Sequence, residues 1–537
     1  MNVQRYFLPF IALFLLAALR CGAQAPEFGE THFPNSGSEE AQNAFVRGLL
    51  LLHSFEYDDA RDAFVEARET DPSFAMAYWG EAMTYNHPVW FSQSTEKARA
   101  ALQRLAPTLA ERVDKAPSER EKDYLRAVDK LFFGGSKKER DFAYSDAMSS
   151  LRDRYPDDLE AAVFYALSLL GCSHGGRDYR LYMRAAAVAE EVFARNPKHP
   201  GAAHYLIHSY DDPVHAPVGL RAARVYADIA PAASHALHMP SHIFVAMGMW
   251  DDVVRSNKES FAASDARVER KNLDVSQRGY HALWWLAYGQ LQQGRFADAR
   301  EALRVVEDDV SRGGSSSRMR NSLIGMRAAY LIDSEDWTSD AGDIVVDLEG
   351  IGLEWKATDH FTLGLVGVKT GDEESARQHL KALLDLTKGS KHESKELGIA
   401  TVLRDELKAL LLIKEGNKKE GLDLLREAAA MERGLVYDFG PPSPVKPASE
   451  LLGDMLLHHG YAKEAQKAYG DALERAPKRA RSLLGLTRAA ARVGDVDSAK
   501  RAHIALREIW HTADQDPMRI LQDTATLGIG IVKKSFE

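Results

Sequence analysis

The chain has 537 residues, more than one compact core usually organises, so several domains or an elongated repeat array are expected. With 45% hydrophobic and 27% charged residues, its composition excludes a disordered or collagen-like chain. It has 68 basic against 78 acidic residues, a net charge of −10 and no long basic run, so nucleic acid is not an expected partner.

Residues 1–25 have the features of a secretory signal: Arg5 near the start, an apolar run over residues 7–19 and a small-residue cleavage site at Ala23-Gln24-Ala25. The apolar run is too short to span a bilayer, so no transmembrane segment is expected. Lipidation at Cys21 is the alternative, but the residue before it is a bulky arginine where the lipidation signal needs a small side chain. We therefore expect a periplasmic or secreted protein.

Cleavage after the signal would leave Cys172 as the only cysteine, so no intramolecular disulfide is expected. We interpret Cys172 as a small buried residue at a helix end. The alternative is a nucleophilic thiol beside His174, and it requires a base in position to activate the thiol.

From about residue 41, apolar residues recur at helical spacing, and paired helices repeat with a period of 34 residues. In the first unit, small residues, an aromatic residue and a closing proline occupy fixed places: Gly48, Ala60, Phe64, Ala67 and Pro72. The same pattern returns near the C-terminus: Gly453, Gly460, Ala465, Tyr469, Ala472 and Pro477. Small residues let antiparallel helices approach closely, the aromatic side chain fills the gap between them, and proline ends the unit.

This pattern resembles the tetratricopeptide repeat (TPR). The resemblance implies an all-α solenoid of antiparallel helix pairs, with roughly nine or ten units, some of them degenerate. No alternating strand pattern occurs. Stretches rich in glycine and serine (311–317) and in proline (439–447) interrupt the array. They predict three divisions: an N-terminal TPR array at 26–310, a middle helical array at 311–440 and C-terminal TPR units at 447–537.

In the TPR family, ligand contacts come mainly from the second, fifth, ninth, twelfth and thirteenth residues of each first helix, which line a concave groove. The resemblance implies the same positions here. Two consecutive units carry histidines at these places: His204 and His208 with Asp211 in one, and His235, His238 and His242 in the next. His204 and His238 are one 34-residue repeat apart, and so are His208 and His242.

Two histidine pairs on adjacent helices can surround one ion, so we predict a divalent transition-metal site. Its predicted residues are His204, His208, His235, His238 and His242, with Asp211 as a ligand or as a group that orients a ring. Imidazole suits zinc, copper, iron or nickel, and the choice among them stays open. The alternative is that these rings bond backbone carbonyls or contact an acidic peptide. If a helix begins at Pro240, His235 and His238 lie in a loop.

Other groove positions are polar or aromatic: His53, Trp79, Asn86 and His87 in the first two units, and His281, Trp284 and Tyr288 in a later one. They predict a platform for a peptide, a protein or a small molecule. The alternative places the tryptophans in the core, and for Trp90 we expect the core.

The segments from His204 to Asp211 and from His235 to His242 also resemble the corresponding segments of a group of exported bacterial TPR proteins. This resemblance implies no particular activity. We predict an exported scaffold that binds a peptide, protein or small ligand in its groove. The alternative is a metal-dependent enzyme, a hydrolase or an oxidoreductase, that uses the histidines. The sequence has no phosphate loop, dinucleotide fingerprint, nucleophile elbow or HExxH string, so the scaffold is favoured.

Overall fold

The computed structural model describes residues 27–313, 316–388, 394–437 and 439–525. The predicted signal at residues 1–25 lies outside these ranges. Within them the chain is all-α, as its helical periodicity predicts, apart from one hairpin of two-residue strands. Among the described residues, no helix combines the length and the apolar character that crossing a membrane requires.

The elements follow one another along the solenoid. The first part contains α1 (Glu39–His53), α2 (Tyr57–Thr70), α3 (Ala75–Met83), β1 (Asn86–His87), β2 (Ser92–Gln93), α4 (Thr95–Leu105), α5 (Leu109–Lys115), α6 (Glu119–Phe132), α7 (Lys137–Arg154), α8 (Leu159–Gly171) and α9 (Tyr179–Arg195). The central part contains α10 (Pro200–Tyr210), α11 (Ala216–Ile229), α12 (Ser234–His238), α13 (Pro240–Met247) and α14 (Trp250–Lys271).

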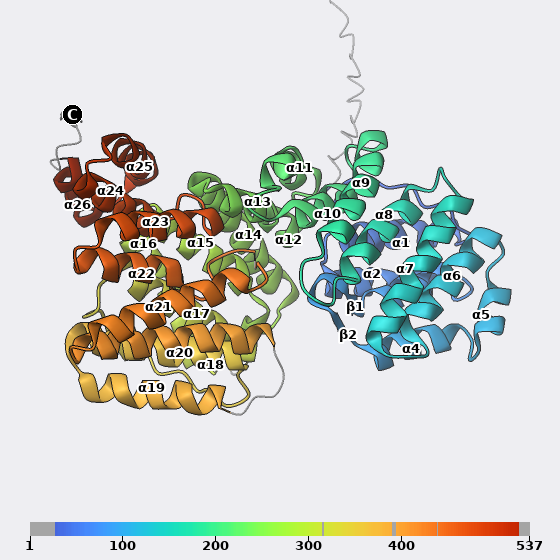
Figure 1. Ribbon diagram of the computed structural model, residues 1–537. Coiled ribbons are helices and arrows are strands. Elements are labelled where there is room, and N and C mark those ends of the chain that lie inside the picture. Colours follow the sequence, from blue (N-terminus) through green and yellow to red (C-terminus); the bar gives the residue numbers. More distant parts are fainter. Residues whose placement is uncertain (1–26, 314–315, 389–393, 438, 526–537) are drawn as a thin grey trace, which may run out of the picture.

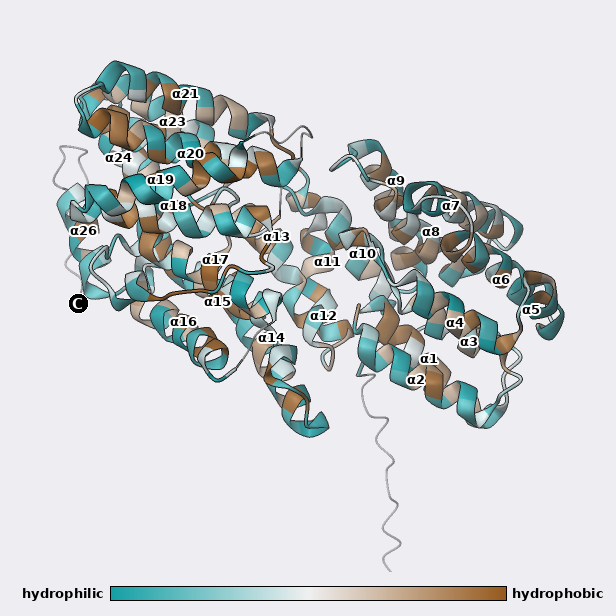
Figure 2. Cartoon of the chain, turned by 90° about the horizontal axis from the view of Figure 1, so that it is seen from below, coloured by the Kyte–Doolittle hydropathy of each residue, from teal (hydrophilic) through white to brown (hydrophobic). Residues whose placement is uncertain are grey.

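The last part contains α15 (Tyr280–Gln292), α16 (Phe296–Ser311), α17 (Ser317–Ser334), α18 (Leu353–Thr370), α19 (Glu373–Thr387), α20 (Lys395–Lys414), α21 (Lys418–Gly434), α22 (Ala448–His458), α23 (Ala462–Arg475), α24 (Ala480–Val493), α25 (Val496–Ile509) and α26 (Gln515–Ala525). Successive helices pack in pairs, such as α1 with α2 and α20 with α21. Figure 1 shows α10 to α13 between the first helices, on the right, and the last helices, on the left. In Figure 2 the enclosed helix α8 is mostly hydrophobic, whereas the outer helix α19 is mostly hydrophilic.

Glycine and an aromatic ring fit together at both ends of the solenoid. A Cβ atom added at Gly48 would lie 2.9 Å from the Phe64 ring, and one added at Gly80, in the next unit, would lie 2.4 Å from it. The Tyr469 ring is held in the same way, at 2.9 Å from a Cβ atom added at Gly453 and 2.2 Å from one added at Gly485. The paired helices approach this closely because glycine leaves room for the ring. The structure is therefore an all-α TPR solenoid.

Ala60 and Ala465 are fully buried at equivalent helix crossings. Replacing either with leucine is expected to lower the free energy of unfolding by about 1 to 3 kcal/mol, because the extra atoms overpack the crossing. Ala100→Leu, on the exposed side of α4, is the matched control and should change stability little. Urea denaturation checks this expectation, and midpoints unchanged in both buried variants would contradict the assigned repeat.

The solenoid turns so that its C-terminal segments reach α14 and α15. The Trp510 indole N–H donates to the Gln292 carbonyl oxygen (3.0 Å), and the Trp250 indole N–H donates to the Lys478 carbonyl oxygen (3.1 Å). The predicted interruptions near 311 and 447 fall between α16 and α17 and between α21 and α22. The division into three arrays stays a prediction.

Candidate metal centre

Six histidines lie together where α10, α12, α13 and α15 meet. Proline occupies the first position of both α10 (Pro200) and α13 (Pro240), where its missing N–H is not needed. Pro240 does not leave the preceding histidines in a loop, because they belong to the short helix α12. We call these residues the histidine cluster: His204, His208, His235, His238, His242 and His281.

The histidine cluster consists of two adjoining sets. The first set is His204, His208 and His235, and the second set is His238, His242 and His281. In each set, one nitrogen from every ring lies within 4.8 Å of the other two. The sets adjoin where the ring centroids of His208 and His242 are 5.4 Å apart. The two predicted pairs are therefore close in space, but each forms its own set with a third histidine.

The neighbours of His238 determine which of its nitrogens carries the proton. The Asn257 side-chain amide donates to the Val253 carbonyl oxygen (2.8 Å), so the amide oxygen faces Nδ1 of His238, 2.6 Å away. An amide oxygen only accepts, so the Nδ1–H of His238 is the donor. In the neutral ring, Nε2 then carries a lone pair.

A carboxylate orients His242 in the same way. Nδ1 of His242 lies 3.0 Å from Oδ2 of Asp211, and Arg177 binds the other carboxylate oxygen at 2.7 Å. Burial opposes the ionisation of Asp211, but Arg177, His208 and His242 outweigh it and hold its pKa below the usual range. The ionised carboxylate accepts from the Nδ1–H of His242, so Nε2 of this ring also carries a lone pair.

These two lone pairs face each other, because Nε2 of His238 and Nε2 of His242 are 3.2 Å apart. With both protons on Nδ1, two neutral rings have no hydrogen to place between the Nε2 atoms. Burial lowers the pKa of both rings, and Asp211 opposes this only in part for His242, so an additional proton is disfavoured. A transition-metal ion fits this place, since it accepts a lone pair from each neutral imidazole.

The histidine cluster is enclosed on one side and accessible on another. His204, His208, His238 and His242 are buried, and the ring of Phe439 packs 4.7 Å from that of His242. His281 is exposed and His235 is half-buried. Solvent therefore reaches the second set at His281.

Asp211, predicted as a ligand or as an orienting group, has the geometry of an orienting group. Its Oδ2 accepts from His242, and it also lies 3.4 Å from Nδ1 of His208. Arg177 binds Oδ1 and holds the carboxylate in place between the two sets. Asp211 therefore positions one ring in each set.

His53 was predicted to line the groove, and this is wrong, because it is fully buried. Its Nε2 lies 2.7 Å from the Glu160 carboxylate, and its Nδ1 lies 2.9 Å from the Tyr205 hydroxyl. Its backbone carbonyl accepts from Nδ1–H of His204 at 2.7 Å. His53 thus lies behind the histidine cluster and orients one of its rings.

The prediction that Trp79 lines the groove is also wrong, since its side chain is 1% exposed. The ring of Phe33, from the extended segment before α1, stacks on Trp79 at a centroid distance of 5.6 Å. Phe33 also contacts Tyr124 at 5.1 Å. This segment covers the face of the first units where the TPR resemblance predicts a ligand-binding groove.

Asn86 and His87 are not on a helix, because α3 ends at Met83 and they form strand β1. Pro88 explains the early end, since proline disfavours helical backbone in the residue before it. Asn86 is buried, and His87 stacks on Tyr57 with ring centroids 4.1 Å apart. Trp90, expected in the core, is 49% exposed.

The three groove residues predicted on α15 have different surroundings. His281 belongs to the second set, and Trp284 packs edge-on against Trp355 at 5.4 Å. Tyr288 is buried, so its predicted place on an open groove is wrong. Its hydroxyl accepts from Arg479 (3.3 Å), because the C-terminal helices close over this part of α15.

Three residues that orient the rings were not predicted: Arg177, Asn257 and Glu160. Asn257 lies on a second helix, α14, and Arg177 lies in the turn before α9, so the groove positions of the repeat do not include them. Glu160 is fully buried and takes part in two contacts with imidazoles, from His53 and His199. The available signal for Glu160 was a single charged residue in an otherwise largely apolar helix, α8.

Cys172 follows the end of α8 and is buried. Burial raises the pKa of its thiol to about 12, and Asp141 adds to this. The thiolate is the nucleophilic form, so this environment favours the structural interpretation over the catalytic one.

Neither a protein-family model nor a curated protein sequence matches the chain. Among solved structures, a chain of the APC/C hetero-tetramer Cut9–Hcn1 is 11% identical with a TM-score of 0.31, over 92% of this chain and 78% of that one. Human IFIT1, solved as a dimer with PPP-AAAA, is 13% identical with a TM-score of 0.35, over 89% and 96%. The TPR domain of P58(IPK) is 12% identical with a TM-score of 0.20, over 91% and 98%. These likenesses carry no argument about function, which rests on the geometry of the site.

Proposed function

We propose that the chain is an exported TPR scaffold that binds a divalent transition-metal ion between His238 and His242. The two Nε2 lone pairs that face each other across 3.2 Å are the observation that carries the proposal. Export rests on the signal predicted at residues 1–25. The scaffold role rests on the repeat, since TPR solenoids present surfaces to peptides, proteins or small ligands.

His281 supplies the third ligand of this centre. Its ring centroid lies 4.7 Å from that of His238, and its exposure lets the side chain adjust to an ion. Imidazole ligands favour zinc, copper, nickel or iron, whereas calcium and magnesium take oxygen ligands. Asn257 and Asp211 accept from the other nitrogen of two of the rings, which is how histidines that bind metals are usually oriented.

A metal-dependent enzyme, a hydrolase or an oxidoreductase, is the second candidate. One observation favours this candidate: the side chain of His281, at the edge of the site, is exposed. Three imidazoles leave a coordination position open on an ion, and a water molecule there becomes more acidic. No described residue stands out as a general base at this place, so the scaffold remains our main proposal.

Protein purified without an affinity tag is expected to contain a transition metal by elemental analysis. His242→Gln should weaken binding of Zn²⁺ to the metal-free protein by at least about tenfold, because the ion loses a ligand. His87→Gln is the matched control, since this histidine stacks on Tyr57 away from the cluster, and it should bind as the wild type does. Wild-type protein that neither contains nor binds a transition metal would refute the proposal.

A further inference from the structure

Both sets of the histidine cluster use the same positions of the TPR frame. Each combines the fifth and ninth residues of one repeat unit with the second residue of the next unit. In the first set, the ring of His235 lies 5.0 Å from that of His204. In the second set, His281 lies 4.7 Å from His238 in the equivalent relation. A site formed by one unit against the next is therefore present twice.

The first set is oriented by hydrogen bonds, as the second is. The Nδ1–H of His204 donates to the His53 carbonyl oxygen at 2.7 Å, so Nε2 carries the lone pair. Glu160 and Tyr205 hold His53 in place at 2.7 and 2.9 Å. Nε2 of His204 has no hydrogen-bond partner among the residues that the structure describes. A histidine that binds a metal usually donates its other N–H to a carbonyl or a carboxylate, as His204 does.

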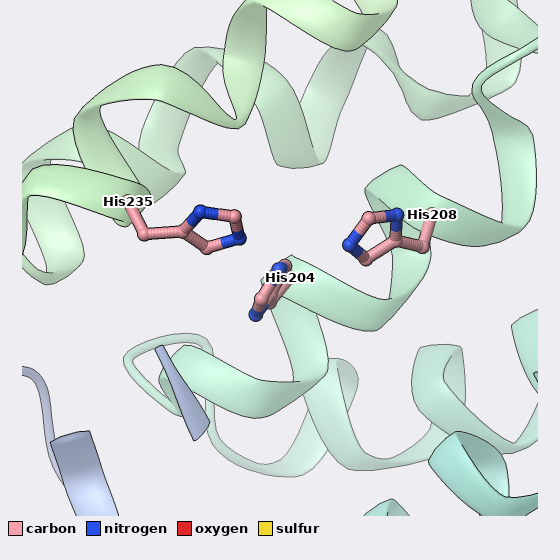
Figure 3. Close-up of side chains that lie close together, drawn as sticks. All are labelled: His204, His208 and His235. Carbon is pink, nitrogen blue, oxygen red and sulfur yellow. The ribbon is translucent and has the colours of Figure 1, made fainter. Parts of the chain in front are cut away.

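The other two rings of the first set also have nitrogens without partners. In the described ranges, Nε2 of His235 and Nε2 of His208 make no hydrogen bond. Figure 3 shows the three rings converging, with His235 opposite His204 and His208 of α10. A buried polar atom without a partner costs about 1 to 3 kcal/mol, so several at one place indicate a ligand that joins them.

We propose that the histidine cluster binds two divalent transition-metal ions side by side, one in each set. This proposal rests on the proposed function and adds a second centre to it. Asp211 is the positioning residue at the join, because its Oδ2 lies 3.0 Å from Nδ1 of His242 and 3.4 Å from Nδ1 of His208. Each ion would have three imidazoles and an open position. Two such neighbouring ions suit a small oxygen-donor ligand, such as a carboxylate or a phosphate, that bridges them.

The number of Zn²⁺ ions bound tests the proposal. Metal-free full-length protein is titrated with Zn²⁺, and bound metal is counted by equilibrium dialysis with elemental analysis. The variants His235→Gln and His281→Gln each remove the ligand that is most accessible in its set, so that the buried packing is kept. His215→Gln, whose ring pairs with Asp212 outside the histidine cluster, is the matched control. Circular dichroism confirms that every variant is folded.

We expect two Zn²⁺ per chain for the wild type and for His215→Gln, one for each of the other two variants, and none for the double variant. One ion per wild-type chain would overturn the second centre while leaving the proposed function intact. Two ions in the wild type that are both lost in either single variant would also overturn it, because the sets would then not be separate sites. No bound ion in the wild type would refute the proposed function as well.

Discussion

Arg479→Met is expected to lower the free energy of unfolding by about 3 to 5 kcal/mol. The Arg479 guanidinium lies 2.5 Å from Asp333 and 2.8 Å from Glu450, and all three side chains are buried. Methionine is similar in length but carries no charge, so it would leave two carboxylates in the core without their main cation. The cost comes from that uncompensated charge more than from the contacts themselves.

Arg426→Met is the control for Arg479, because Arg426 pairs with Asp423 and Glu464 on the exposed surface. Its loss should cost less than about 1 kcal/mol, since water screens such pairs. Urea denaturation at pH 7 compares the two variants. Similar small losses for both would mean that Arg479 does not join α17, α22 and α24 as the structure shows.

The metal-free protein is expected to lose stability steeply as the pH falls from about 6.5 to 5. Burial lowers the pKa of His204, His238 and His242 below their value of about 6.5 in the unfolded chain. In this window the unfolded state binds protons that the folded state does not, so stability decreases as the pH decreases. Each histidine contributes at most about 1.4 kcal/mol per pH unit, so the three together contribute at most about 4 kcal/mol per pH unit.

His238→Gln should reduce this slope by up to about 1.4 kcal/mol per pH unit, because one buried group no longer titrates. His458→Gln, on the exposed surface, should leave the slope unchanged. The free energy of unfolding is measured by urea denaturation at pH 6.5, 6.0, 5.5 and 5.0, without metal. If the free energy of unfolding of the wild type does not change across this window, that result would contradict the claim that the rings of the histidine cluster are buried in their neutral form.

The sequence predicts the helix pairs because the pattern that encodes them is local and repeated. Gly48 and Phe64 must fit each other within one unit, and the same fit returns at Gly453 and Tyr469. The superhelical turn depends on small rotations that add up from unit to unit, and no short pattern records them. The contact between Trp510 and α15 therefore emerges only from the structure.

The candidate site was predicted in part for the same reason. The 34-residue spacing brings the two histidine pairs onto neighbouring helices, and the structure places His208 beside His242. The TPR frame also indicates the third histidine of each set, because His235 and His281 both occupy the second position of their repeat units. Trp79 was wrongly predicted to line the groove, because Phe33 belongs to an extended segment without periodicity, which covers the face beside Trp79.

Anomalous X-ray diffraction from crystals of tag-free protein, recorded at the absorption edge of the metal found by elemental analysis, tests the central claim most directly. We expect an anomalous peak within about 2.0 to 2.1 Å of Nε2 of both His238 and His242 if the ion is zinc. Two nitrogens at this distance from a tetrahedral ion lie about 3.3 Å apart, so the two rings need to move only slightly from their 3.2 Å contact to admit the ion. A structure without an anomalous peak, in which the two Nε2 atoms keep this contact, would contradict a metal centre in the histidine cluster.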